Sequence, residues 1–423
     1  MRAAAVLLLA AVLIAQSPPT WQEMRRAARA AREAKDYPAL RDNLRKLYAL
    51  APGHPGMVYN QGAVEALLGN KDAALDWLRL YAEMGFAWDI AAEADFAAIR
   101  QSEGFKQIEA RMAENRKPVS NSQVAFTLPE KDLLAEDITY DPKTKTFYVS
   151  SVHHRKILAI DAHGAAREFI REGQDGVWAM LAVAVDAKRR VLWASTAAMG
   201  QALGYQAADA GRSAMLKYDL RTGKQLKRYD LQRVDGQQHV LGDMTLSPDG
   251  DVYIGDASGA VYMISHRRDV LEVLVGPGEI VGPQTPALSP DGKRLFVADY
   301  GRGIAIVDLA SRAVSWLATP KNLGVAGIDG LYLTGRQLIA VQNGTSPIRI
   351  IRIQLDSSLT RAESWQVIEA NTKALGTPTH AVVVGRELFF IGNSGWDNFE
   401  DEGPIKKGAV FQPPQILKVR LTP

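Results

Sequence analysis

The chain has 423 residues, of which 47% are hydrophobic and 23% charged, so it is long enough for two folded units and wholesale disorder is excluded. Its net charge is only +3 and its basic residues form no long run, which argues against a general nucleic-acid-binding protein. The absence of cysteine excludes disulfides, thiolate metal sites and cysteine nucleophiles.

The first 17 residues have the pattern of a signal peptide. Arg2 supplies a positive charge, residues 3–15 form an unbroken apolar run, and small residues around Ala15 and Ser17 suit cleavage. This run is shorter than the roughly 20 residues that span a bilayer, and no later stretch is long and apolar enough to do so. We therefore expect an exported protein, periplasmic or secreted, without a membrane span.

Residues 18–115 are predicted to form a domain of helical hairpins. Apolar residues recur there at spacings of three and four, as in Leu40, Leu44 and Leu47, and a shift of 35 residues superposes small residues on small residues. Asn60-Gln61-Gly62, followed by Gly69 and Ala74, resembles tetratricopeptide repeats. That resemblance implies a surface for a protein partner, whereas two hairpins are equally consistent with a packing or capping domain.

Two further short helices are expected at the end of this domain, at residues 95–99 and 104–108, and residues 116–122 are expected to be a linker. Beyond the linker the pattern changes to short β-branched and aromatic runs separated by turns rich in Asp, Gly and Pro. This change of period marks a domain boundary.

Residues 123–423 are predicted to form a six-bladed β-propeller, which makes the fold class mainly β with an N-terminal α-helical hairpin domain. A strand, a tight turn and a second strand recur six times, with starts separated by 45, 61, 42, 45 and 50 residues, close to the length of a four-stranded blade. Seven blades is the main alternative. Residues 123–128 are expected to pair with the last blade and close the ring, since an open ring would leave unpaired strand edges.

Equivalent residues at the six strand starts are expected to surround the mouth of the central channel. They are Glu136, Leu181, Gly242, Gln284, Asp329 and Thr379, followed in four blades by the polar residues Asp137, Asp243, Thr285 and His380. Two converging carboxylates would repel each other unless a cation or proton lies between them, and oxygen donors of this kind suit calcium, magnesium or manganese, with zinc also possible. Alternatively, these side chains hydrogen-bond backbone and water in a wet channel.

Several of these motifs resemble the senescence marker protein, gluconolactonase and luciferin-regenerating enzyme superfamily. The resemblance rests on Glu136 with Tyr140-Asp141, the Ser-Pro-Asp-Gly turn at residues 289–292 and Asp329-Gly330-Leu331. It implies a divalent metal, calcium as first choice, held by Glu136, Gln284 and Asp329, with Asp329 as general base and His380 as the alternative. Gln284 and Gly242 replace asparagines of the family.

Two functions follow from this sequence. The first is an exported metal-dependent hydrolase of a lactone or related small ester. The second is a non-enzymatic propeller that binds a small-molecule ligand or a protein, with the helical repeats as a docking surface, and the departures at Gly242 and Leu181 favour it. His153 and His154 are expected to be poor joint metal ligands, because adjacent residues of a strand point to opposite faces, and they are expected to be surface or turn residues instead.

Overall fold

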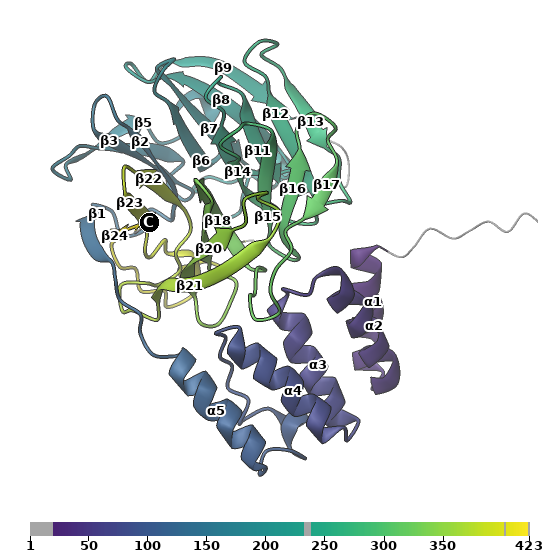
Figure 1. Ribbon diagram of the computed structural model, residues 1–423. Coiled ribbons are helices and arrows are strands. Elements are labelled where there is room, and N and C mark those ends of the chain that lie inside the picture. The colour runs from purple at the N-terminus through teal and green to yellow at the C-terminus, as the bar shows by residue number, and fades with distance from the viewer. Residues whose placement is uncertain (1–19, 232–237, 402, 422–423) are drawn as a thin grey trace, which may run out of the picture.

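A computed structural model of the chain describes residues 20–231, 238–401 and 403–421. The predicted signal peptide lies outside the described residues. The described chain forms an N-terminal group of helices and a six-bladed β-propeller (Figure 1), which confirms the predicted fold class.

Five α-helices make up the N-terminal part. They are α1 (Trp21–Glu33), α2 (Tyr37–Leu50), α3 (Pro55–Leu67), α4 (Lys71–Glu83) and α5 (Glu103–Asn115), with the 3-10 helix η1 (Ala94–Phe96) before α5. Helix α5 is longer than the short helix expected there. Ser102 caps it by accepting the Phe105 N–H, and Phe105, Ile108 and Met112 bury one continuous face.

The propeller consists of six four-stranded antiparallel sheets. Blade 1 contains β2 (Ala135–Asp141), β3 (Thr146–Ser151), β4 (Lys156–Ile160) and β5 (Ala166–Ile170). Blade 2 contains β6 (Ala179–Asp186), β7 (Val191–Ala197), β8 (Ser213–Asp219) and β9 (Gln225–Asp230). Blade 3 contains β10 (Leu241–Leu246), β11 (Val252–Asp256), β12 (Ala260–Ile264) and β13 (Leu271–Val275).

The remaining blades follow the same order of strands. Blade 4 contains β14 (Pro283–Leu288), β15 (Arg294–Asp299), β16 (Gly303–Asp308) and β17 (Val314–Trp316). Blade 5 contains β18 (Ile328–Thr334), β19 (Gln337–Gln342), β20 (Arg349–Leu355) and β21 (Ala362–Ala370). Blade 6 contains β22 (Ala381–Val384), β23 (Glu387–Ile391), β24 (Gln415–Arg420) and, as its outer strand, β1 (Gln123–Thr127).

Blade 6 closes the ring. β1 pairs antiparallel with β24, with Gln123 opposite Lys418 and Thr127 opposite Gln415, which confirms the predicted closure. The second and third strands of the blades are buried on both faces, because each blade packs between two neighbours, whereas outer strands such as β5 and β9 are half-exposed. This difference explains why β4 and β7 are mostly apolar in sequence, whereas β5 and β9 carry several charged residues.

The helices pack against one face of the propeller, beside blades 4 and 5 (Figure 1). Arg349, at the start of β20, is fully buried and donates from Nη1 to the Met84 carbonyl oxygen at 2.8 Å and from Nε to Gln342 Oε1 at 2.8 Å. Its guanidinium carbon lies 4.1 Å from the centre of the Phe86 ring. Backbone hydrogen bonds from Ala87 to Ser346 and from Val325 to Gly53 continue this contact.

Gly85 makes this close approach possible. Its φ of +80° is a left-handed conformation that favours glycine, and a Cβ there would lie 2.7 Å from Arg349 Nη1. The two parts of the chain are therefore fitted to each other at a specific contact.

Candidate metal centre

The inner strands of blades 1 to 5 each carry a β-bulge where the sequence places the ring around the channel. In blade 1, Ala135 pairs with Ser151 and Ile138 with Val149, so that Glu136 and Asp137 together face Ser150. The same two-against-one register recurs at residues 181–182, 242–243, 284–285 and 329–330. A bulge redirects side chains, so both members of each pair can reach the channel.

Hydroxyl groups connect the bulges of blades 1, 2 and 4 to the next blade. Ser195 accepts the Ala182 N–H at 2.9 Å and donates to the Gly242 carbonyl oxygen at 3.0 Å, and Ser150 binds Asp137 and Leu181 in the same way. Thr285 likewise donates to the Asp329 carbonyl oxygen at 2.8 Å. The backbone groups freed by the bulges are thus satisfied, and the spacing of the blades at the channel is fixed.

Three side chains converge inside this ring: Asp243, Asp329 and His380. One ligand atom from each lies within 4.8 Å of the other two, and all three residues are at least nine-tenths buried. His380 Nδ1 lies 2.8 Å from the Glu136 carbonyl oxygen, to which only a protonated nitrogen can donate. The opposite nitrogen, Nε2, lies 3.0 Å from Asp243 Oδ1 and is buried without a hydrogen-bond partner among the described residues.

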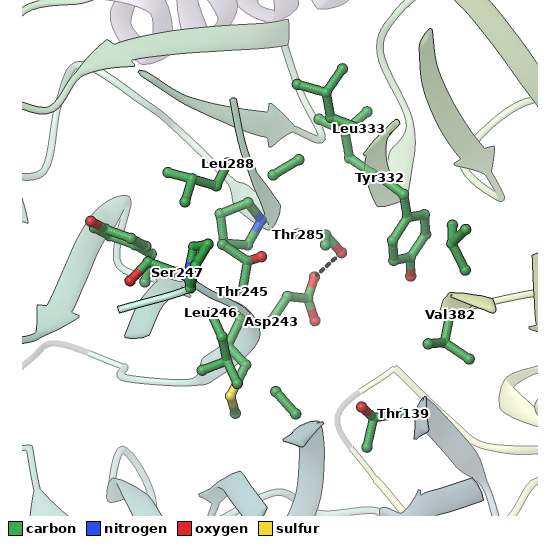
Figure 2. Close-up of a pocket in the computed structure, with 18 of the residues that line it drawn as sticks. Thr139, Asp243, Thr245, Leu246, Ser247, Thr285, Leu288, Tyr332, Leu333 and Val382 are labelled. Atoms are coloured by element: carbon green, nitrogen blue, oxygen red, sulfur yellow. Dashed lines mark hydrogen bonds between the residues drawn. The ribbon is translucent and has the colours of Figure 1, made fainter. Parts of the chain in front are cut away.

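This geometry fits a divalent cation. A backbone carbonyl that binds one imidazole nitrogen and so turns the other toward carboxylates is the usual arrangement around a metal-binding histidine. Asp329 is held by Asn343, whose Nδ2 donates to Asp329 Oδ2 at 2.6 Å, and Asp243 Oδ2 accepts from Thr285 at 3.2 Å (Figure 2). Two carboxylate oxygens and one imidazole nitrogen suit manganese, zinc or iron better than calcium.

The electrostatics of the cluster point in the same direction. Burial raises the pKa of Glu136 to about 8, of Asp137 to about 7 and of Asp329 to about 6, and neighbouring carboxylates add to the rise while His380 opposes it. The pKa of His380 is raised well above its usual value, because Asp243 and Asp329 outweigh the effect of burial. Four acids around one imidazole leave an excess of negative charge that protons or a metal ion must balance.

Glu136 lies at the edge of this cluster. Its Oε2 accepts a 2.6 Å hydrogen bond from Trp396 Nε1, in the 3-10 helix η4 (Trp396–Asn398) of the loop at residues 392–414. Gln284 is partly exposed in the bulge of blade 4, next to the buried Thr285. The ligand roles expected of Glu136 and Gln284 therefore stay predictions, whereas Asp329 and His380 do lie together with Asp243.

We predict that Trp396→Phe lowers the free energy of unfolding by about 1.5 to 3 kcal/mol, because a buried carboxyl group loses its donor. Trp88→Phe is the matched control. The Trp88 indole also donates to a carboxylate, Glu93 Oε1 at 2.9 Å, but Trp88 is 48% exposed, so its loss should cost less than about 0.5 kcal/mol. Chemical denaturation of both variants tests this, and equal losses would contradict it.

Two cavities approach the cluster. One of about 670 Å³ is lined by Asp137, Asp243, Thr285 and His380 and extends between the inner strands of the blades (Figure 2). The other, of about 710 Å³, lies between the helices and blades 4 and 5, and its lining includes Asn343. The described helices thus form one wall of a cleft that ends one hydrogen bond from Asp329.

Sequence reasoning named Asp243 only as a neighbour of the ring, and it did not find Asn343 or the contact of Trp396 with Glu136. Asp243 had a signal, because it directly follows the aligned strand start Gly242. Asn343 follows the second strand of blade 5, and Trp396 lies in a long loop, where one sequence carries no repeat pattern.

Solved structures with a similar fold include enzymes of several activities. One is a gluconolactonase from Xanthomonas campestris, with a TM-score of 0.47 and 15% identity over 72% of this chain and 96% of that one. Another is a luciferin-regenerating enzyme, with a TM-score of 0.47 and 15% identity over 72% of this chain and 98% of that one. A virginiamycin B lyase from Staphylococcus aureus also matches, with a TM-score of 0.45 and 15% identity over 70% of this chain and 98% of that one. No protein-family model and no curated protein sequence matches the chain.

The likeness to these solved structures concerns the propeller fold alone. Within the described part of the chain, every helix is too short or too polar to cross a bilayer.

Proposed function

We propose that the channel binds a divalent metal ion through Asp243, Asp329 and His380, and that the protein is a metal-dependent hydrolase of a lactone or a related small ester. The observation that carries this proposal is the fixed orientation of His380. Its Nδ1–H is held by the Glu136 carbonyl oxygen, so its Nε2 faces Asp243 and Asp329 within the buried ring. Manganese or zinc suits this mixed donor set, although calcium was the first choice from the sequence.

A metal ion bound here would polarise an ester carbonyl and lower the pKa of a water molecule. Asn343 holds one oxygen of Asp329 and so orients the carboxylate toward the water that it would act on as a base, and in the metal-free site burial raises the pKa of Asp329 to about 6. Glu136, with its pKa raised to about 8, stays protonated at neutral pH and can donate a proton to a leaving oxygen. Two acids whose pKa values differ in this way suit separate base and acid roles.

Gly242 leaves space for the substrate. A Cβ at this position would meet no atom within 4 Å, so the room that an asparagine side chain would take in the ring is open. The cleft between the helices and the propeller would admit the rest of the molecule, with Tyr59, Trp88 and Tyr300 as apolar walls and the Arg25 guanidinium as a cation. In this proposal the helices contribute to ligand binding rather than to a separate docking surface.

The test uses residues 18–423, stripped of metal and then titrated with Mn²⁺, Zn²⁺ and Ca²⁺ before assay on a panel of sugar and aliphatic lactones and small esters. We expect one channel metal per chain and metal-dependent turnover, and His380→Ala should lose at least about 10-fold in metal affinity and about 100-fold in rate. The control is His266→Ala, because His266 forms a comparable pair with Asp251, at 2.9 Å, on the surface. Wild-type affinity and rate in His380→Ala would refute the proposal.

A second candidate function is binding without turnover, and the replacement of a family asparagine by Gly242 favours it. The same experiment separates the two, because a ligand-binding propeller would take up metal without hydrolysing any compound of the panel. A product with a new carbon–carbon double bond and no added water would instead identify a lyase.

We also propose export to the periplasm or the medium, on the basis of the charged start and apolar run of residues 1–17. N-terminal sequencing of the protein from a cell fraction tests it. A new N-terminus near Ser17 in the exported fraction is expected, and an intact Met1 in the cytoplasm would contradict export.

A further inference from the structure

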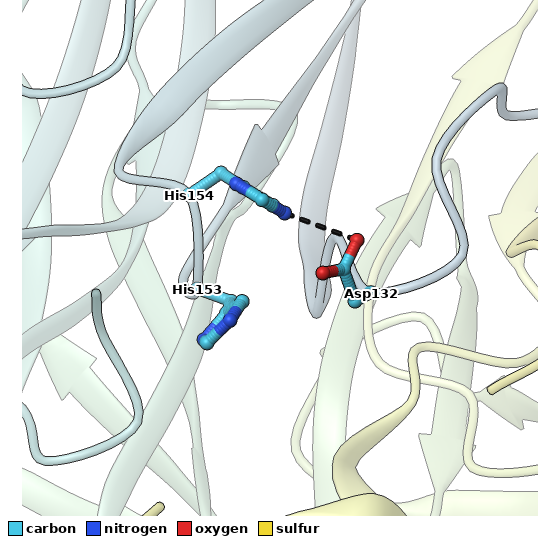
Figure 3. Close-up of side chains that lie close together, drawn as sticks. All are labelled: Asp132, His153 and His154. Carbon is cyan, nitrogen blue, oxygen red and sulfur yellow. Dashed lines mark ion pairs between the residues drawn. The ribbon is translucent and has the colours of Figure 1, made fainter. Parts of the chain in front are cut away.

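His153 and His154 lie in the turn that joins β3 to β4, at residues 152–155, rather than in a strand. The alternation of strand side chains therefore does not apply to them. Their ring centres are 5.1 Å apart and the rings are nearly perpendicular, at 79°. One ligand atom of each histidine and one carboxylate oxygen of Asp132 lie within 4.8 Å of one another (Figure 3).

Each imidazole is already held through one nitrogen. His153 Nδ1 lies 2.6 Å from the Gln201 carbonyl oxygen, which can only accept, so this nitrogen carries the proton. His154 Nδ1 lies 3.2 Å from Glu172 Oε2. Both contacts are the outer hydrogen bonds that metal-binding histidines usually make, and they leave Nε2 of each ring available as a ligand.

His154 Nε2 has an unusual environment. It lies 3.1 Å from Asp132 Oδ1 (Figure 3), and it is buried without a hydrogen-bond partner among the described atoms. If the proton of His154 is on Nδ1, two lone pairs face each other across this distance, which requires a cation or a second proton between them. The contact thus points to a bound ion through an observation separate from the mere proximity of three ligands.

We infer that Asp132, His153 and His154 form a second metal site, distinct from the channel, that takes a divalent first-row transition metal. Two imidazole nitrogens and one carboxylate oxygen suit zinc, iron or cobalt rather than calcium or magnesium. Ligands around tetrahedral zinc are about 3.3 to 3.6 Å apart, given bonds of about 2.0 to 2.2 Å, so small side-chain movements from the present spacing complete the site.

The position of the site gives it a structural task. Gln201, whose carbonyl oxygen holds His153, lies in the long connection between β7 and β8, and its side chain donates to the carbonyl oxygens of Glu400 and Asp401 at 3.1 and 2.8 Å. The Leu203 N–H donates to the His153 carbonyl oxygen, and the Phe399 ring lies 5.1 Å from the His153 ring.

His153 therefore joins the β3–β4 turn to two loops. The second of these loops also carries Trp396, which binds Glu136 at the edge of the channel cluster. A metal ion that fixes His153 would hold both loops in place over this edge.

The test is a titration of residues 18–423 with Co²⁺, whose visible absorption reports its coordination, followed by competition with Zn²⁺. We expect a site that persists in His380→Ala but loses at least about 10-fold in affinity in His154→Gln and Asp132→Asn. Asp132 and His154 are partly exposed, so these variants should fold, and circular dichroism checks that they do. His163→Ala, an exposed histidine of the same blade, is the control.

A second readout tests the loops. Hydrogen exchange of residues 396–411 should slow on addition of Zn²⁺ in the wild type and in His380→Ala, and not in His154→Gln. Unchanged affinity in His154→Gln, or a signal lost only in His380→Ala, would overturn the inference and leave His154 as an imidazolium between two carboxylates. Since His380→Ala removes only the channel site, failure here and failure of the proposed hydrolase are distinguishable.

Discussion

The metal-free protein is expected to unfold at a temperature several degrees higher at about pH 6 than at about pH 8. Burial raises the pKa of Glu136, Asp137 and Asp329 to about 8, 7 and 6, so these three groups bind more protons in the folded chain than in the unfolded chain between about pH 4 and pH 8. Burial lowers the pKa of His54 to about 4, and this single opposing group is outweighed by the three carboxyl groups. By linkage, the free energy of unfolding falls as the pH rises through this window. His380 acts in the same direction, because its pKa is raised in the folded chain. Its contribution to stability is fully present below about pH 6.5, the pKa of an unfolded histidine, and is lost as the pH rises through the pKa of the folded state.

A saturating divalent metal should remove the part of this dependence that comes from its ligands Asp329 and His380, since it replaces the protons on these two side chains. In the metal-free protein the free energy of unfolding is expected to be at least about 2 kcal/mol higher at about pH 6 than at about pH 8, because one unit of pKa corresponds to about 1.4 kcal/mol. Denaturant unfolding at both pH values measures it. In Asp329→Asn the free energy of unfolding should depend less on pH than in the wild type. In the control Asp251→Asn, which changes a surface pair, the dependence should equal that of the wild type. A metal-free protein that is more stable at pH 8 than at pH 6 would contradict this expectation.

Arg349→Ala is expected to lower the free energy of unfolding by about 3 to 5 kcal/mol and to loosen the helices from the propeller. The substitution leaves a buried cavity and removes the donor from two buried acceptors, the Met84 carbonyl oxygen and Gln342 Oε1. It also removes the contact of the guanidinium with the Phe86 ring. Limited proteolysis of the linker at residues 116–122, together with thermal unfolding, measures both effects.

Arg349→Met separates packing from hydrogen bonding at this contact. Methionine fills most of the space of the arginine side chain. Burial also disfavours the charged form of Arg349 and lowers its pKa to about 9, so replacing the charge with an apolar group offsets part of the loss. We therefore expect Arg349→Met to lose about half as much stability as Arg349→Ala. Arg361→Ala, at an exposed position in the same blade, should stay within about 0.5 kcal/mol of the wild type. An equal loss of stability in Arg349→Ala and in the control Arg361→Ala would show that the buried contact does not hold the two parts together.

The repeat of strand, turn and strand was enough to predict the propeller, because each blade buries the same kind of surface and carries the same turn residues. It also located the ring around the channel, since the aligned strand starts coincide with the first residue of each bulge. The helical hairpins were visible for a similar reason, as their small and apolar residues recur at a fixed spacing.

The details of the candidate site depend on features that no repeat encodes. An alignment of strands gives one inward residue per blade, whereas the bulges bring Asp243 and Asp329 to the same place from different members of their pairs. Trp396 reaches Glu136 from the long loop between the neighbouring strands β23 and β24. His153 and His154 lie in a turn, one of the two places that the sequence suggested, and the strand alternation that argued against a joint ligand role does not apply there.

The closure of the ring makes the last strand decisive for the solubility of the whole chain. Every other blade is built from neighbouring hairpins, but blade 6 joins Gln123 to Lys418, so its outer pairing forms only when both ends of the propeller are present. A chain that stops before β24 would expose the edges of both β1 and β23, and such edges recruit strands from other molecules. Premature termination or proteolysis near residue 414 would thus convert a closed ring into a template for aggregation, which light scattering of the shortened chain would reveal.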